Sequence, residues 1–378
     1  MNEWKIYKLS EIGTIIGGAT PSTSNPHYYG GQIPWITPKD LSTLNGRFIE
    51  KGERNITEKG LSSCSAQLLP QGSILFTSRA PIGYVAIAKN PITTNQGFKS
   101  IVPNEKVNNI FLYYLMVYNK SNIEAMGSGT TFKEVSGSTM KKVEIRIPNI
   151  DVQKRIASIL ASLDDKIELN RRINDNLEEQ AKALFKSWFV DFDRNEWVHC
   201  ELGDITLITA GGDRPSKYTN KKTIECHVPI YSNGIDNEGL YGYTNVAKIH
   251  EESITISARG TIGYVCLRLE PYVPIVRLIS IIPNKKELSA KYLYLWALTQ
   301  NITGTGTTQQ QLTVPIFRKT PISIPSDTKL KQFNSIADPL FSQIESNKKE
   351  NIKLSTLRDT LLPKLMSGEI SVEEVSLD

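Results

Sequence analysis

Apolar residues recur at alternating spacings of four and three along two long stretches of the chain. The first series runs from Ile156 to Trp188, and residues 151–191 around it contain neither glycine nor proline. A second series lies 177 positions further on, from Phe333 to Leu365, with the same spacing. Such spacing is typical of a helix whose apolar seam packs against another helix in a coiled coil. The sequence therefore predicts two long helices.

Each seam is interrupted at its middle by two asparagines, and these occupy matching positions in the two series. Simple solvent exposure is one interpretation. A polar residue on a seam also costs stability but fixes register and orientation. Because the second helix returns after the second domain, we expect antiparallel pairing. The predicted helix-pairing contacts are Asn170 with Asn351 and Asn174 with Asn347.

Prolines set the expected ends of these helices. Pro148 and Pro325 stand just before them, and Pro363 with Gly368 is expected to close the second. Pro339 lies early in the second series, so a kink or a late start is expected there.

The remaining regions, roughly 1–150 and 197–326, are rich in Gly, Pro, Thr and Ser between short β-branched and aromatic runs. This pattern predicts many short strands joined by turns. Helical spacing predicts one short helix in each region, at Phe111–Tyr118 and Tyr292–Leu298. The expected fold class is α+β: two similar mixed α/β domains separated by two long helices in an antiparallel coiled coil.

The two mixed regions repeat one another. Ser73–Val85 returns as Ser253–Val265, and Ser100–Asn104 returns as Ser280–Asn284. A repeat of this length makes each copy a whole domain. We therefore predict a pseudo-twofold internal repeat with a first domain at 1–150, a spacer helix at 151–194, a second domain at 195–326, a second helix at 327–370 and a tail at 371–378.

Length and composition agree with two folded domains. The 378 residues, 39% of them hydrophobic, suffice for two cores and connectors. A net charge of +5 is compatible with nucleic acid but is weak evidence alone. The lack of an 18-residue apolar stretch and of a signal-peptide layout favours a cytoplasmic protein without membrane association.

The sequence lacks the common catalytic signatures: the Gly-x-x-x-x-Gly-Lys phosphate loop, the Gly-x-Ser-x-Gly elbow and His-Glu-x-x-His. We interpret Asp164-Asp165 and Glu251-Glu252 as solvated faces. His199-Cys200 and Cys226-His227 converge poorly on one metal ion, because neighbours on a strand point to opposite faces. We predict no catalytic residue and no metal site.

Several runs together resemble the DNA-specificity subunit of type I restriction–modification systems, over almost the whole chain. They are Ile33–Leu41, Leu69–Gly83, Thr94–Lys99, Gln153–Ala157 and Leu361–Ile370. The resemblance implies two target-recognition domains, each reading half of a bipartite double-stranded DNA sequence, with paired helices setting the gap. Two methyltransferase subunits, which carry S-adenosylmethionine, would assemble on the helices. Up to two restriction subunits, which use ATP and Mg, are optional further partners. This subunit would itself be non-catalytic and hold no cofactor.

The second copy departs from the first. Val228–Ile235 matches Ile33–Leu41 poorly, and Asn95-Gln96-Gly97 has no counterpart near Ile275–Arg277. We therefore expect different half-sites. A standalone two-domain DNA-binding regulator and a tandem hydrolase are the alternatives. Against the regulator stand apolar residues that suggest a partner-docking surface: Phe185, Phe189, Val190 and Phe192.

Candidate DNA-binding residues fall into three groups. Arg79 and Arg259 hold equivalent places before a turn, where each could bind phosphate, read guanine or tie loop carbonyls. Two Gly-Thr-Thr turns offer donors to phosphate, or are plain turns, and divergent residues follow them: Thr130, Thr131 and Lys133 in one copy, Thr307, Thr308 and Gln309 in the other. Weaker candidates are Asn95, Gln96, Lys99 and Lys217.

Overall fold

The computed structural model describes residues 4–129, 133–191, 197–284, 288–302 and 312–375. The chain forms two compact units: Met1–Arg171 with Lys348–Asp378, and Arg172–Asn347. Each unit contains one mixed α/β domain and a part of both long helices. The units are described in turn.

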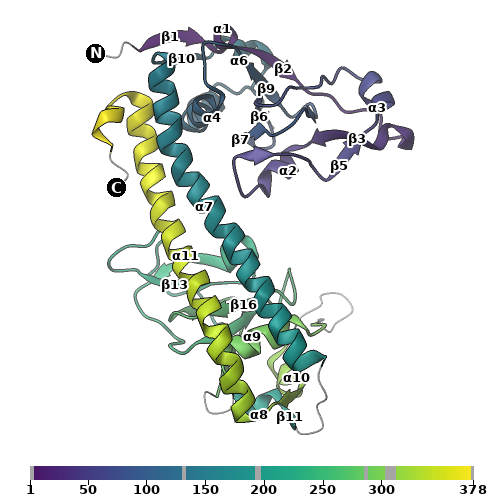
Figure 1. The fold of residues 1–378 in the computed structure, drawn as a ribbon, viewed down its shortest axis with the longest axis vertical. Helices are drawn as coiled ribbons and strands as arrows, with labels where there is room; N and C mark the ends of the chain where they lie inside the picture. The colour runs from purple at the N-terminus through teal and green to yellow at the C-terminus, as the bar shows by residue number, and fades with distance from the viewer. Residues whose placement is uncertain (1–3, 130–132, 192–196, 285–287, 303–311, 376–378) are drawn as a thin grey trace. The chain divides into compact units, whose positions relative to one another are not determined.

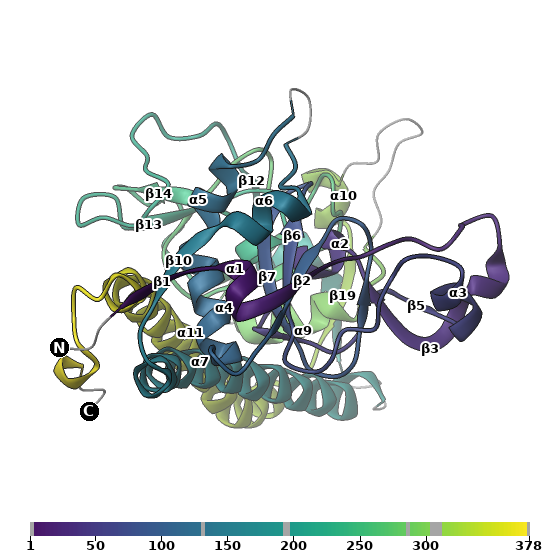
Figure 2. The ribbon, with the colours of Figure 1, turned by 90° about the horizontal axis from the view of Figure 1, so that it is seen from above.

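The first unit contains three sheets (Figure 1). A five-stranded sheet has the order β2 (Gly13–Gly17), β9 (Lys99–Pro103), β6 (Ile74–Ser78), β7 (Ile82–Ala88) and β4 (Phe48–Ile49). A three-stranded sheet has the order β5 (Arg54–Ile56), β3 (Tyr29–Ile36) and β8 (Thr93–Thr94), and lies to one side of the larger sheet in both views (Figure 1, Figure 2). β1 (Lys5–Lys8) pairs with β10 (Glu144–Ile147).

Short helices complete this unit: α1 (Leu9–Ile12), α2 (Pro38–Ser42), α3 (Glu58–Ser62), α4 (Asn109–Tyr118), α5 (Lys120–Ala125), α6 (Gly137–Lys142) and the 3-10 turn η1 (Pro26–Tyr28). All five residues of β6 are buried, as expected of a central strand. Phe111, Leu112 and Leu115 of α4 join the core that this strand enters. The α4 helix starts where Asn108 accepts a hydrogen bond from the N–H of Phe111 at 3.0 Å.

The second unit repeats this plan. Its four-stranded sheet has the order β12 (Thr206–Ala210), β18 (Ile279–Pro283), β15 (Ser253–Ile256) and β16 (Val265–Arg268). A three-stranded sheet has the order β14 (Leu240–Thr244), β13 (Val228–Tyr231) and β17 (Val273–Pro274), and β11 (Val198–Glu201) pairs with β19 (Pro321–Ile324). Its helices are α8 (Leu202–Ile205), the 3-10 turn η3 (Asp236–Gly239), α9 (Ala290–Leu298) and α10 (Val314–Arg318). The predicted α+β repeat is confirmed.

The long helices are α7 (Ile150–Phe185), continued by a π-helical turn η2 (Lys186–Val190), and α11 (Asp327–Ser367). A last 3-10 turn is η4 (Val372–Glu374). Within the first unit, α7 and α11 are antiparallel: Asp164 contacts Arg358, and Asn170, later on α7, contacts Asn351, earlier on α11. They are antiparallel within the second unit as well, where Asn174 contacts Asn347 and Phe185, later on α7, packs on Phe333, earlier on α11.

The late start considered for Pro339 and the closing role expected of Pro363 were wrong, whereas the helix closes at Gly368 as predicted. Pro339 neither delays nor ends α11, and Pro363 also lies inside it; the helix ends before Gly368, whose φ is +76°. Pro339 is on the exposed face, while Phe333 and Ala337 beside it on the seam are fully buried. Tertiary packing on that seam therefore outweighs the missing backbone hydrogen bond.

The predicted docking surface at the end of α7 was also wrong. Phe185 and Phe189 are each only 2% exposed and pack edge-to-face on Tyr292 and Phe333 in the core of the second unit. Val190 is half-buried against the same core, and Phe192 lies outside the described residues. A helical pattern cannot distinguish a surface awaiting a partner from one covered by the chain's own domain.

Among the described residues, no helix is both long enough and apolar enough to cross a lipid bilayer.

Candidate nucleic-acid interface

Three segments of the first unit meet at the end of β6. The N–H of Ser78 donates to the carbonyl of Gly97 at 2.8 Å, and the Ser78 carbonyl accepts from the N–H of Val135 at 2.9 Å. These bonds bring Arg79 beside the turn that contains Asn95 and Gln96 and beside the loop that precedes Val135. The structure thus gathers candidates that lie far apart in the sequence.

One carboxylate holds the two cations of this edge. Glu134 accepts from Nη1 of Arg79 at 3.3 Å and from Nζ of Lys99 at 3.4 Å. The Arg79 side chain is 37% exposed and that of Lys99 only 15%. The backbone of Glu134 also pairs with Ser128 in both directions, at 3.0 and 2.9 Å. Arg79 is therefore oriented by an ion pair, whereas loop carbonyls were the alternative that the sequence offered.

The other first-domain candidates divide by role. Asn95 accepts from the N–H of Gly97 at 2.9 Å, so its side chain shapes the turn. Gln96 is exposed and accepts a hydrogen bond from the hydroxyl of Thr20. Lys133 is exposed, and its neighbours Thr130 and Thr131 lie outside the described residues.

The second unit has a turn at the same place. β8 and β17 pair in parallel with β3 and β13, and the registers Ile36 to Thr94 and Tyr231 to Pro274 correspond. The next N–H donates back in both: Asn95 to the Ile36 carbonyl and Ile275 to the Tyr231 carbonyl, each at 2.9 Å. Ile275–Leu278 is therefore the counterpart of Asn95–Phe98. The expectation of no counterpart was wrong, because the shared feature is a backbone pairing that dissimilar side chains conceal.

The two turns differ in conformation. Val276 and Arg277 have positive φ, +53° and +61°, which Gln96 and Gly97 do not. Asn233 supports this shape: its Nδ2 donates to the Val276 carbonyl at 2.6 Å and its Oδ1 accepts from the N–H of Ala258 at 2.7 Å. Ala258 corresponds to Ser78, whose N–H is bonded to the Gly97 carbonyl instead. In the second unit, the side-chain oxygen of Asn233 thus accepts the hydrogen bond that a backbone carbonyl accepts in the first.

An arginine–tyrosine cluster lies close to this turn. Gly211 and Gly212 accept from the N–H groups of Arg277 and Val276, both at 2.9 Å. Two residues further on, the Arg214 guanidinium stands 4.0 Å from the Tyr218 ring centroid. It also donates to the Tyr241 hydroxyl at 2.9 Å, a bond that raises the pKa of Arg214. An arginine held on aromatic rings suits binding to phosphate or bases.

The predicted second-domain candidates have mixed surroundings. Arg259 is exposed directly after Ala258. Lys217 forms an ion pair with Glu225. Thr307, Thr308 and Gln309 lie outside the described residues. Sequence reasoning missed Arg214, Asn233 and Arg277; of these only Arg214 carried a signal, the nearby Tyr218.

A buried ionic network corrects the interpretation of Asp164 as part of a solvated face. Asp164 is only 6% exposed; it accepts from the Tyr114 hydroxyl at 2.5 Å and from Nη1 of Arg358 at 2.6 Å. Arg47, only 3% exposed, lies 3.9 Å from Asp164 and also contacts Glu168 at 3.4 Å. Burial, followed by the Asp164 charge, raises the pKa of Tyr114. Asp164 therefore joins the first domain to α7 and α11 and has no catalytic arrangement.

The seam asparagines pair within each unit as follows. Nδ2 of Asn170 donates to Oδ1 of Asn351 at 3.0 Å in the first unit. Nδ2 of Asn347 donates to Oδ1 of Asn174 at 2.8 Å in the second. Asn170 is 1% exposed and Asn347 is 5% exposed, so solvent exposure does not explain why these two asparagines stand on the seam.

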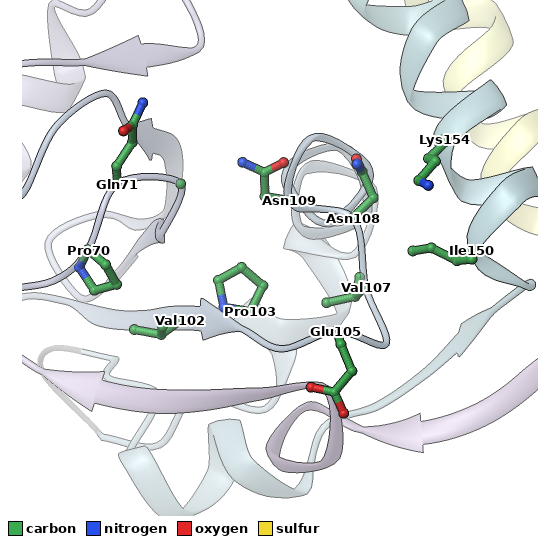
Figure 3. A pocket seen from close by; sticks show the side chains of 11 residues that line it. Pro70, Gln71, Val102, Pro103, Glu105, Val107, Asn108, Asn109, Ile150 and Lys154 are labelled. Atoms are coloured by element: carbon green, nitrogen blue, oxygen red, sulfur yellow. The ribbon is translucent and has the colours of Figure 1, made fainter.

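An open hollow of about 460 Å³ lies where the first unit's β9 ends and α4 and α7 begin (Figure 3). Asn108 and Lys154 border it, and the Asn108 carboxamide is already used in capping α4. The hollow therefore shows no convergent catalytic group. Among the described residues, no three His, Cys, Asp or Glu side chains are grouped as a metal site requires.

Comparison with known proteins adds to this geometry. A family model described as "Type I restriction modification DNA specificity domain" matches residues 1–179 and 194–356. The chain is 37% identical over 410 residues to the type I restriction enzyme MjaIX specificity subunit of Methanocaldococcus jannaschii, covering 99% of this chain and 95% of that protein. It is 26% identical over 471 residues to the HindI specificity subunit of Haemophilus influenzae, covering 98% and 100%. A crystal structure of a type I S subunit from M. genitalium shares the fold, with a TM-score of 0.60, 18% identity, and 97% and 96% of the chains covered.

Proposed function

Because the chain belongs to the type I restriction–modification DNA specificity family, we propose that each of its domains reads one half of a bipartite double-stranded DNA target. One observation carries this proposal. The two domains present a turn at the same backbone place with unlike side chains, Gln96 in the first and Val276-Arg277 in the second. A shared frame with different exposed side chains suits the recognition of two different half-sites.

In this proposal, cations held beside each turn supply the attraction to the phosphate backbone: Arg79 and Lys99 are held by an ion pair with Glu134, and Arg214 by aromatic rings. Arg79 and Lys99 at the first edge and Arg214 at the second are placed for phosphate contacts, which position the protein without reading sequence.

We further propose that two methyltransferase subunits assemble along α7 and α11. Large apolar side chains exposed on the helices of the first unit support this: Leu169 at 47%, Ile352 at 67% and Leu357 at 42%. These partners would bring S-adenosylmethionine and the adenine-methylating activity, and restriction subunits would bring ATP and Mg. The chain would act in the cytoplasm as the non-catalytic reader of the complex.

Long-read methylation sequencing of cells that carry the complete system tests the reading function. We expect one bipartite methylated sequence with a fixed gap, which disappears when this gene alone is deleted. Persistence of the same methylated sequence without this gene would contradict the proposal.

Co-purification separates the complex from a standalone regulator. The tagged chain, expressed with the methyltransferase subunit of the same restriction–modification system, should retain that subunit through size-exclusion chromatography. Leu169→Lys with Ile352→Lys should weaken the retention, whereas Lys142→Glu, at an exposed position of α6 outside both long helices, should leave it intact.

A further inference from the structure

The turn of the second domain is held in a conformation that its residues do not favour. Val276 and Arg277 are consecutive non-glycine residues with positive φ. Such a conformation costs free energy, most of all for a β-branched residue, and persists only where surrounding contacts impose it. Residues in this state cluster at functional sites. The corresponding residues of the first domain, Gln96 and Gly97, do not have positive φ.

Surrounding contacts use up the backbone of this turn. The N–H groups of Val276 and Arg277 donate to Gly212 and Gly211, and the Val276 carbonyl accepts from Asn233. The N–H groups of Val276 and Arg277 are therefore not available to bind phosphate. What the turn presents outward is the pair of exposed side chains of Val276 and Arg277.

The turn rests on a rigid support. The carbonyl of Tyr231 accepts from the N–H of Ile275 at 2.9 Å. The Tyr231 ring lies 3.5 Å from the buried guanidinium of Arg268 and 5.8 Å from the Tyr272 ring. Asn233 fixes the other side by bonding both Val276 and Ala258. A side chain at Arg277 is thus presented from a pre-organised frame.

We propose that Arg277 reads a guanine in the half-site contacted by the second domain, and that Asn233 is the positioning residue that holds the turn for it. The guanidinium fork matches O6 and N7 of guanine bidentately. No ion pair joins Arg277 to any described residue, in contrast to Arg79 at the first edge. The fork is therefore available to a base. This inference rests on the proposed function.

Arg277→Lys in the complete system tests it by methylation sequencing. Lysine keeps the charge but loses the fork. Discrimination against the wrong base should fall roughly five- to 150-fold at one guanine of the second half-site, with every other position of the target unchanged. Arg318→Lys, an exposed arginine of α10 in the same unit, is the matched control and should change nothing.

Two results would overturn the inference. A uniform fall in methylation across all target variants would make Arg277 a phosphate contact, and an unchanged profile would place it outside the interface. A changed first half-site would instead overturn the modular reading on which the inference rests, so the two failures are distinguishable.

Asn233→Ala tests the positioning role. It should lower discrimination at the same guanine as Arg277→Lys does. The double variant should discriminate at that base no worse than the single arginine variant. Melting temperatures of the purified complex identify loss of folding. A lower melting temperature with equal loss at every target position would reduce Asn233 to a structural role and overturn this part of the proposal.

Discussion

At the residue scale, the polar groups that were hardest to interpret from sequence are those whose partners come from distant segments. The sequence favours a solvated face for Asp164, one of two consecutive aspartates on a predicted helix. The structure covers it with Tyr114 and Arg47 from the first domain and Arg358 from α11. Local pattern cannot show which side of a helix a separate domain will cover.

Removing the Asp164 charge should destabilise the first unit. Asp164→Asn leaves Arg358 and Arg47 without a carboxylate that they share in a buried site, and breaking such a pair costs about 3–5 kcal/mol. Asp327→Asn, in an exposed pair with Lys331, should cost less than about 1 kcal/mol. Urea unfolding measures both changes. Equal free energies of unfolding for the two variants would contradict the network's role.

Arg79→Ala tests the first edge. If Arg79 holds phosphate, affinity should fall for all DNA sequences alike, and the slope of log affinity against log salt should shrink by about one unit. Binding at several salt concentrations measures this, with Arg146→Ala, an exposed residue of β10 in the same domain, as control. A lower melting temperature with an unchanged slope would assign Arg79 to the ion pair with Glu134 alone.

At the element scale, the regular spacing of apolar residues predicted where the helices lie, because that spacing is a property of each helix alone. The four-three spacing gave both long helices with starts within a few residues of Ile150 and Asp327. Helical spacing also gave most of α4 and α9. The burial of Phe185 and the place of Pro339 inside α11 could not be predicted in this way, because both depend on what packs against the helix. The matching turns at Asn95 and Ile275 were hidden because backbone pairing leaves no trace in unlike side chains.

Pro339→Ala should stabilise the protein. Pro339 sits on the exposed face of α11, where it removes a backbone hydrogen bond without contributing to the seam. Alanine restores that bond and helix propensity, so the free energy of unfolding should rise by about 1–3 kcal/mol. Gln332→Ala, exposed on the same helix, should change it by less than about 0.5 kcal/mol. Chemical denaturation measures both, and a destabilised Pro339→Ala variant would refute the argument.

At the scale of the whole molecule, one framework occurs twice with separate cores. The first unit is centred on β6 and α4 and the second on β15 and α9. Each domain has its own turn beside its small sheet, and the hydrogen bonds described for each turn come from residues of its own unit. Recognition is therefore modular in this account: one domain, one half-site.

The most direct test of that claim is a domain exchange read by methylation sequencing. Residues 1–150 are replaced by the corresponding domain of a relative with a known target, and the complete system is expressed. The account predicts that one half-site changes to that of the donor, while the other half-site and the gap between them remain as before. Simultaneous change of both half-sites would contradict it.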